Sequence, residues 1–223
     1  LPPLLQRLYG YSVLQSGELT VPRGIGTLIS MLTVGKLSQK IDLRILVALG
    51  MALMGWSLQM MSGFALVQGA RPVIVSGIVQ GLGLGMLFVT IQALAFATLE
   101  PKLRTAAASL LNLSRNIGGS VGISVVTAEL IRNGQTAHAD IGQHVSTATF
   151  PQLVTAMTEQ FGLPAQAAFA MIDAEINRQA AFIAYLDDFR LMMWVTFAAI
   201  PLVLLLRPPK PGKSGETPHA AMD

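Results

Sequence analysis

Two uncharged stretches stand almost back to back in the first half of the chain, and they constrain the fold more than any other feature. Residues 45–70 carry no charged side chain, residues 72–99 carry none either, and only Arg71 separates them. A bilayer core needs about 20 apolar residues per helix. Soluble domains very rarely carry two such stretches side by side. The chain is therefore expected to be an all-α polytopic membrane protein.

The composition favours the same surroundings. The chain is 52% hydrophobic and 12% charged, and its mean hydropathy is +0.56. A net charge of +3 is compatible with nucleic-acid binding, but the basic residues lie at the ends of apolar runs, where lipid headgroups meet them. We expect a lipid bilayer as the partner of this surface, and no nucleic acid. With no cysteine in the chain, disulfides and thiol chemistry are excluded.

About five transmembrane helices are expected from the apolar runs, at residues 17–37, 45–67, 73–99, 106–131 and 191–206. The last run has 16 residues and contains Pro201, so its helix is expected to start earlier in the chain. The opening Leu1-Pro2-Pro3-Leu4-Leu5 has no basic segment or cleavage site, so it is not a signal peptide. It is interpreted as the tail of an earlier span, which predicts that the chain is the C-terminal part of a longer protein.

The predicted organisation has five parts. They are residues 1–16, the tail of a preceding span and an outer loop; 17–131, four transmembrane helices; 132–188, a periplasmic loop with an amphipathic helix; 189–207, the last transmembrane helix; and 208–223, a cytoplasmic tail. In the loop, Phe169, Ile172, Ile176 and Phe182 are spaced to share one helical face, and no Gly or Pro occurs from position 165 to 200. A helix on the outer surface is expected to run into the last span.

Lysine and arginine predict the orientation, because they concentrate in cytoplasmic connections. Alternate connections hold most of them, and the connection at residues 68–72 holds only Arg71. The basic residues of the predicted cytoplasmic side are Lys36, Lys40, Arg44, Lys102, Arg104, Arg207, Lys210 and Lys213. We therefore predict a multi-pass protein of the bacterial inner (cytoplasmic) membrane whose C-terminus is cytoplasmic.

Glycines recur every four residues in two of the predicted spans. Gly77, Gly81 and Gly85 form one face, and Gly118 and Gly122 continue a face that begins with Ser114. Such faces let a neighbouring backbone approach closely. We interpret them as helix-packing surfaces, which is compatible with sliding between helices during transport.

Polar residues inside the spans are the candidates for a substrate pathway or gate. Arg115 is a lone charge deep in its span, flanked by Asn112 and Asn116. A charge near the bilayer centre costs at least about 2.5–3.5 kcal/mol on insertion scales, so it normally faces a cavity or a partner. The alternative for Arg115 is a structural anchor, for Arg23 snorkelling to the interface, and for Gln80 an interhelical hydrogen bond.

Several kinds of site are not expected. None of the twelve Asp and Glu residues falls in the middle of a span, so a titrating carboxylate for proton coupling is expected outside this chain. His138 and His144 lie six residues apart near Asp140, a weak pattern for a metal. We expect no metal, no cofactor and no catalytic residues, and hence no enzyme.

A resemblance becomes visible in the connection between the first two spans. Gly35, Lys36, Lys40, Asp42 and Arg44 resemble a degenerate copy of the cytoplasmic loop motif of the major facilitator superfamily, although Ile41-Asp42-Leu43 replaces the usual glycine-containing turn. Residues 22–27, 80–85, 101–104, 115–118 and 122–124 are similar to the EmrB/QacA group of 14-span drug:proton antiporters. The resemblance covers nearly the whole chain.

The resemblance implies the C-terminal part of a major-facilitator helix bundle. It also implies a secondary active transporter for proton-coupled multidrug efflux across the inner membrane. The implied partners are the N-terminal half of the same transporter, a periplasmic membrane-fusion adaptor and an outer-membrane channel. The alternatives are an uptake permease of the same fold, a structural half-bundle without activity when isolated, and the membrane anchor of a redox complex. The last would need histidine pairs or quinone-site acids in its spans, which the sequence lacks. The residues leave substrate, direction and oligomeric state open.

Overall fold

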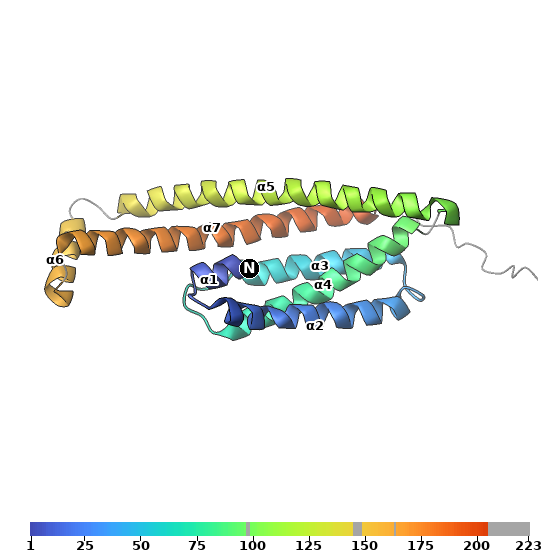
Figure 1. Ribbon diagram of the computed structural model, residues 1–223, viewed down its shortest axis with the longest axis horizontal. Helices are drawn as coiled ribbons and strands as arrows, with labels where there is room; N and C mark the ends of the chain where they lie inside the picture. The colour runs from blue at the N-terminus through green and yellow to red at the C-terminus, as the bar shows by residue number, and fades with distance from the viewer. Residues whose placement is uncertain (97–98, 145–148, 163, 205–223) are drawn as a thin grey trace, which may run out of the picture.

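The computed structural model describes residues 1–96, 99–144, 149–162 and 164–204, and every regular element in these ranges is a helix (Figure 1). The predicted all-α fold class is confirmed. The elements are α1 Pro2–Arg7, α2 Val13–Leu37, α3 Leu43–Ser62, α4 Ala70–Phe96, the 3-10 helix η1 Pro101–Leu103, α5 Arg104–His144, α6 Thr149–Phe161 and α7 Ala165–Leu204. The predicted tail, residues 208–223, lies outside the described residues.

Local capping explains where two of the helices begin. At the start of α2, the Ser12 hydroxyl accepts a hydrogen bond from the Gln15 amide at 3.2 Å, and the Gln15 side chain accepts one from the Ser12 amide at 3.0 Å. At the start of α3, the Asp42 carboxylate accepts from the Arg44 amide at 3.0 Å. These bonds satisfy backbone donors that have no partner inside a helix. The acid of the predicted loop motif therefore has a local structural role.

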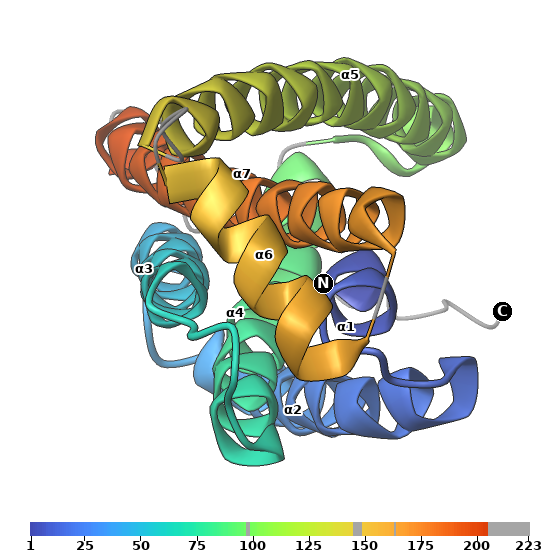
Figure 2. The same ribbon diagram turned by 90° about the vertical axis from the view of Figure 1, so that its left-hand side faces the viewer.

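The bundle is organised around α4, which contacts α2 on one side and α3 on another. Next, α7 packs against α3, and α5 packs against α7, so that α5 and α2 lie on opposite sides of the molecule (Figure 2). Two buried serines join helices through main-chain carbonyls. Ser30 of α2 donates to Leu82 at 2.7 Å, and Ser57 of α3 donates to Ser76 at 2.8 Å. Such bonds between helices add to van der Waals packing where apolar burial gives little driving force.

Two helices of the described residues, α3 and α4, are long and apolar enough to cross a membrane by length and composition. They correspond to the two uncharged stretches on either side of Arg71. The other three expected spans fall within α2, α5 and α7, whose transmembrane role stays a prediction. Residues 205 and 206 of the last expected span are outside the described residues.

The main apolar cluster lies at one end of the bundle. It brings α1 against the end of α3, the beginning of α4 and the middle of α7. Its largest fully buried side chains are Leu4, Leu5, Met61 and Val73. The rings of Phe64 and Phe189 meet edge to face there, with centroids 6.5 Å apart. Because Phe64 lies two residues beyond the end of α3, this contact places the middle of α7 level with the ends of the two apolar helices.

Beyond that level, α5 and α7 continue side by side as a helical hairpin, with α6 at its tip (Figure 1). We use "hairpin" for residues 131–144, 149–161 and 165–188. The predicted outer connection is thus built mostly from helices. Asn133, Gly134 and Gln135, which begin the predicted outer connection, continue α5. Packing explains this continuation, because a Cβ on Gly134 would lie 3.9 Å from the Ala184 Cβ, an ordinary contact between α5 and α7.

Candidate functional site

The glycine face of α4 packs against the backbone of α2. A Cβ placed on Gly81 would collide with the carbonyl oxygen of Arg23 and would lie 2.9 Å from the Thr27 amide nitrogen. A Cβ on Gly85 would lie 2.6 Å from the Thr27 carbonyl oxygen, whereas one on Gly77 would make ordinary contacts, 3.7 Å from the Arg23 Cβ and 3.9 Å from the Arg23 amide nitrogen. The seam between α2 and α4 is therefore closest at Gly81 and Gly85, where no side chain fits.

A second close approach was not anticipated from the sequence. A Cβ on Gly83 would lie 2.7 Å from the carbonyl oxygen of Gly50, and one on Gly50 would lie 3.1 Å from the carbonyl oxygen of Gly83. Gly83 and Gly50 thus face each other across α4 and α3. Gly83 is visible in the sequence as a glycine outside the four-residue spacing. Its partner, Gly50, could not be predicted, because it depends on which helix packs there.

The predicted glycine face of α5 has no neighbour in the described part of the chain. Nothing lies within 4 Å of a Cβ built on Gly118 or Gly122. Most of α5 from residue 105 to 130 is exposed, including apolar side chains such as Leu113, Ile117 and Val121. A packing role for Gly118 and Gly122 remains a prediction about contacts with lipid or with further helices.

Arg115 lies over an aromatic ring. Its guanidinium carbon is 4.7 Å from the centroid of Phe88, a cation–π contact that joins α5 to α4. The arginine is exposed, as are Asn112 and Asn116 on the same helix. Sequence reasoning singled out the charge but missed Phe88, because nothing in the spacing indicates which ring lies opposite. The structure therefore brings Arg115 to α4, the same helix that carries Gln80.

Gln80 is 8% exposed, and its Oε1 atom has no hydrogen-bond partner within the described residues. It lines a cavity of about 660 Å³ between α3, α4, α5 and α7, which we call the bundle cavity. The walls are largely apolar, and they include Met54, Leu58, Gly122, Val126, Met192 and Val195. A buried amide oxygen on an apolar wall is the kind of polar contact that orients a ligand. The interhelical hydrogen bond considered for Gln80 is not formed by its oxygen here.

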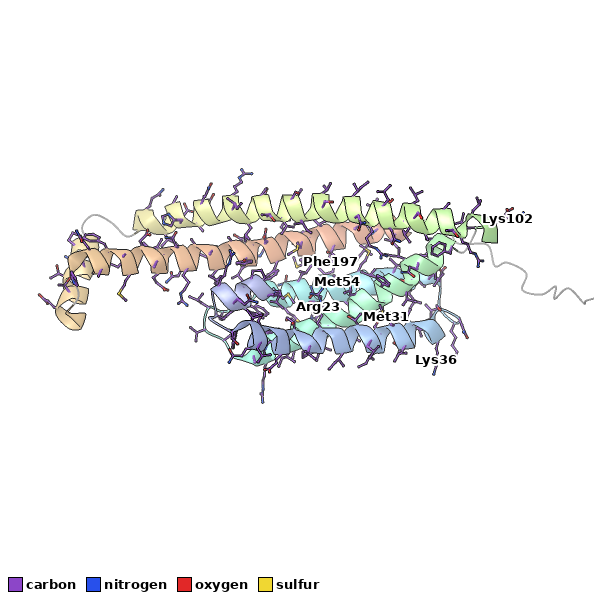
Figure 3. All side chains as sticks on the ribbon, viewed as in Figure 1. Arg23, Met31, Lys36, Met54, Lys102 and Phe197 are labelled. Carbon is purple, nitrogen blue, oxygen red and sulfur yellow. The ribbon has the colours of Figure 1, made fainter. Side chains whose placement is uncertain are left out.

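Arg23 lies apart from this cavity. It is half-buried on α2 and lines a groove of about 460 Å³ with Thr27, Met31 and Leu84. The labelled side chains of Arg23 and Met31 lie along α2 in Figure 3. Because α2 and α5 lie on opposite sides of the molecule (Figure 2), the two arginines proposed for the pathway are not brought together.

The residues of the loop motif differ in their exposure to solvent. Gly35, Lys36 and Lys40 are exposed, whereas Arg44 is half-buried with its Nε and Nη2 atoms buried and unpartnered in the described residues. Lys36 at the end of α2 and Lys102 in η1 lie at the same end of the molecule, away from the hairpin (Figure 3). One lysine from each of these two basic segments therefore lies at this end of the bundle.

A second cavity, of about 650 Å³, lies at the base of the hairpin, and we call it the hairpin cavity. Its polar lining comes from three segments: Arg7 of α1, Gln135 and His138 of α5, and Asn177 and Tyr185 of α7. His138 Nε2 is 3.7 Å from a carboxylate oxygen of Asp173. No group of three or more potential metal ligands occurs in the parts of the chain that the structure describes.

One buried acid was missed by sequence reasoning. Asp188 of α7 is 2% exposed, and its Oδ1 atom is buried with no hydrogen-bond partner in the described residues. It precedes the expected last span by three residues and lies beside Phe189, level with the end of α3. The sequence signal for this burial was the set of apolar residues one turn away from it in the stretch from 165 to 200, which lacks Gly and Pro. Its burial depends on which helices pack against this part of α7, which the sequence does not reveal.

Comparisons with known proteins add a family to this geometry. A model of the Major Facilitator Superfamily matches residues 1–135. The multidrug export protein EmrB of Escherichia coli K12 is 26% identical over 215 residues, which cover 94% of this chain and 41% of EmrB. The fatty acid resistance protein FarB of Neisseria gonorrhoeae is 26% identical over 211 residues, again 94% of this chain and 41% of FarB. The colistin resistance protein EmrB of Acinetobacter baumannii is 27% identical over 172 residues, 74% of this chain and 33% of that relative.

The resemblance drawn from the loop motif and the glycine-rich spans is confirmed by these matches. The chain spans about two fifths of the length of the first two relatives. The family model covers more than half of the chain, and the described residues form the helical bundle that such a match implies. The chain belongs to the Major Facilitator Superfamily.

Proposed function

We propose that the chain is the C-terminal part of a proton-coupled multidrug efflux transporter of the bacterial inner membrane. The observation that carries this proposal is the similarity to multidrug export proteins, which extends over 94% of the chain rather than over one motif. The bundle cavity supports it, because an apolar wall with one unpartnered amide oxygen suits varied lipophilic compounds better than one polar solute. In this proposal Gln80 contacts substrate, and Arg115 with Asn112 and Asn116 forms part of the pathway or gate.

The test uses the chain together with the remaining helices that its relatives possess. An efflux-deficient bacterial host expressing this transporter should tolerate higher concentrations of lipophilic drugs and should accumulate less ethidium. Gln80→Leu should change the ranking of the exported compounds at matched membrane abundance. The matched control is Gln59→Leu on α3, because Gln59 does not line the bundle cavity. Faster ethidium accumulation on expression would favour the uptake permease instead, and no change would contradict the proposal.

A further part of the proposal concerns partners. The hairpin reaches well beyond the bundle, since 24 residues of helix from 165 to 188 span about 36 Å. We propose that its tip, α6 with the adjoining turn of α7, docks a periplasmic adaptor protein that links the pump to an outer-membrane channel. The alternative is that the hairpin only covers the mouth of the bundle.

Replacing residues 149–161 by a flexible linker of equal length tests this docking. The change removes α6 but leaves the seam between α5 and α7 in place, because α6 packs on α7 alone among its main contacts. We expect weaker co-purification of the adaptor with normal membrane insertion. A matched control replaces Ser38 and Gln39, in the connection between α2 and α3, by glycines. Unchanged co-purification would support the covering role.

A further inference from the structure

The Asp188 carboxyl group has an unusual environment. The residue is 2% exposed, and its Oδ1 atom finds no hydrogen-bond donor in the described residues. An ionised carboxylate buried without a partner is strongly unfavourable, so such a group is normally neutral or paired with a cation. Nothing in the fold described above uses this side chain for packing or capping.

The charged groups around Asp188 do not supply a cation. From α5 the neighbouring charge is Glu129, and from α7 itself it is Asp187. Tyr185 lies one turn before Asp188 on α7. Burial raises the pKa of that tyrosine, and the positive charge of Arg7 on α1 partly opposes this rise. No basic nitrogen of the described residues forms an ion pair with Asp188, whereas Glu129 and Asp187 face Arg132 and Arg190 at 3.9 and 3.8 Å. The surroundings of Asp188 therefore favour its neutral, protonated form.

Asp188 also occupies a particular place between the two cavities. One turn before it, Ala184 and Tyr185 line the hairpin cavity, and one turn after it, Leu191 and Met192 line the bundle cavity. On α5 the same order holds, because Leu130 lines the hairpin cavity and Thr127 lines the bundle cavity. The carboxyl group thus lies between a cavity with several polar side chains in its lining and one that is almost entirely apolar.

We propose that Asp188 is a proton-binding site of the transporter, which takes up a proton from water in the hairpin cavity and holds it as a neutral acid at the entrance of the bundle cavity. This inference rests on the proposed function. It places a titrating carboxylate within this chain, where the sequence predicted none. The step is a simple proton transfer: a hydronium ion gives its proton to a carboxylate oxygen of Asp188, and the reverse transfer occurs when the group becomes hydrated.

The direction of the pKa agrees with this role. Burial, together with the charges of Glu129 and Asp187, raises the pKa of Asp188 to about 6 from an ordinary value of 3.8. A raised pKa means that the folded protein holds the proton between about pH 4 and pH 6, where the unfolded chain releases it. The site is then occupied in a mildly acidic outer medium and empties as the pH rises through about 6.

The first experiment measures protonation without transport. Infrared spectra of the full transporter in lipid nanodiscs are recorded during a pH titration, for the wild type, Asp188→Asn and the control Asp173→Asn. Asp173 lies on the same helix with an exposed side chain. We expect a protonated carboxyl band that disappears with a midpoint near pH 6 in the wild type and the control, and is missing in Asp188→Asn. An unchanged band in Asp188→Asn, or a midpoint below the ordinary value of about 4, would overturn the proposal; the low midpoint would reveal a cationic partner.

The second experiment measures coupling in proteoliposomes with ethidium. Asp188→Asn should reduce export driven by a pH gradient at least tenfold while leaving ethidium exchange without a gradient intact, which shows that the variant is folded. Asp188→Glu should restore part of the driven export. Unchanged driven export by Asp188→Asn would overturn the proposal. Absence of ethidium transport by the wild type would instead contradict the proposed function, and the infrared titration would still decide whether Asp188 binds a proton.

Discussion

At Gly81 a missing side chain determines how closely two helices approach. The α2 backbone occupies the volume that a Cβ would need, with the Arg23 carbonyl oxygen nearest. Any larger residue must push α2 away along the whole seam, because both partners at this point are rigid main chain. The seam also contains the bond from Ser30 to Leu82, which depends on the same separation.

We expect Gly81→Ala to lower the unfolding free energy by about 1–3 kcal/mol, the usual effect of overpacking, and Gly81→Leu to abolish folded protein or transport. Gly118→Ala is the matched control, since nothing lies within 4 Å of its Cβ position. In a helix this control should be neutral or stabilising by up to about 1 kcal/mol. Thermal melting of the purified transporter in detergent measures both. Equal melting temperatures for Gly81→Ala and the wild type would show that α2 can move away freely.

Arg115 is expected to act as a cation held over an aromatic face. Arg115→Ala removes the charge and should abolish drug resistance, whereas Arg115→Lys keeps a cation that can still meet Phe88 and should retain part of it. Phe88→Leu should bring the wild-type arginine to about the level of the lysine variant. Minimum inhibitory concentrations at matched membrane abundance rank the four proteins. Full resistance in Arg115→Ala would show that the residue has only a passive role.

The limits of sequence reasoning are clearest at single residues. Spacing alone singled out the Gly77–Gly81–Gly85 face and the lone charge of Arg115, because both are local patterns. The partner of each, the Arg23 backbone and the Phe88 ring, depends on which helices meet. Asp188 was missed for the same reason. An acid that precedes an expected span looks exposed in the sequence, whereas in the folded bundle it is 2% exposed.

Among the elements, α4 differs from its neighbours because it presents glycine to both of them. One face meets α2 through Gly81 and Gly85, and another meets α3 through Gly83. A helix enclosed in this way has little room for side-chain adjustment, so it can move only by sliding or tilting as a unit. Its apolar length followed directly from the uncharged stretch of the sequence, whereas its central position in the bundle did not.

The segment that follows the short helix α1 is joined to the bundle by a polar contact that can be tested. The Tyr9 hydroxyl donates a hydrogen bond to the Ala65 carbonyl oxygen at 2.5 Å, and burial raises the pKa of Tyr9 to about 12. Tyr9→Phe should cost about 1 kcal/mol of stability, measured by thermal melting, with Tyr11→Phe as the control. The raised pKa predicts a further loss of stability as the pH rises from about 10 to about 12, and Tyr9→Phe should remove that loss. A pH profile unchanged by the substitution would contradict this assignment.

For the long helices, the sequence is most informative where no breaker occurs. The stretch from 165 to 200 lacks Gly and Pro and lies within α7, as predicted. Asn133, Gly134 and Gln135 carry turn-like chemistry, yet they stay helical because α7 lies alongside. Tertiary contact outweighs a propensity difference of about 1 kcal/mol per residue.

At the scale of the whole molecule, charge and shape divide the bundle into two different ends. Lys36 and Lys102 lie at the end opposite the hairpin (Figure 3). The lysine-rich end is predicted to be cytoplasmic and the hairpin periplasmic. A fluorescent reporter fused after Lys213 should fold as a cytoplasmic fusion, and alkaline phosphatase fused near Gln143 should be active as a periplasmic one. The reverse pattern would overturn the predicted orientation.

The unbroken course of α7 also has a mechanical consequence. A helix of 40 residues is a stiff rod about 60 Å long, and its middle is held against α3. In the predicted orientation, such a rod is a lever with its pivot at the expected membrane surface. A tilt of about 10° displaces an end that lies about 36 Å from the pivot by roughly 6 Å. Conformational cycling within the lipid would thus be converted into a stroke at the tip of the hairpin, and an object attached there would be pulled and released once per cycle.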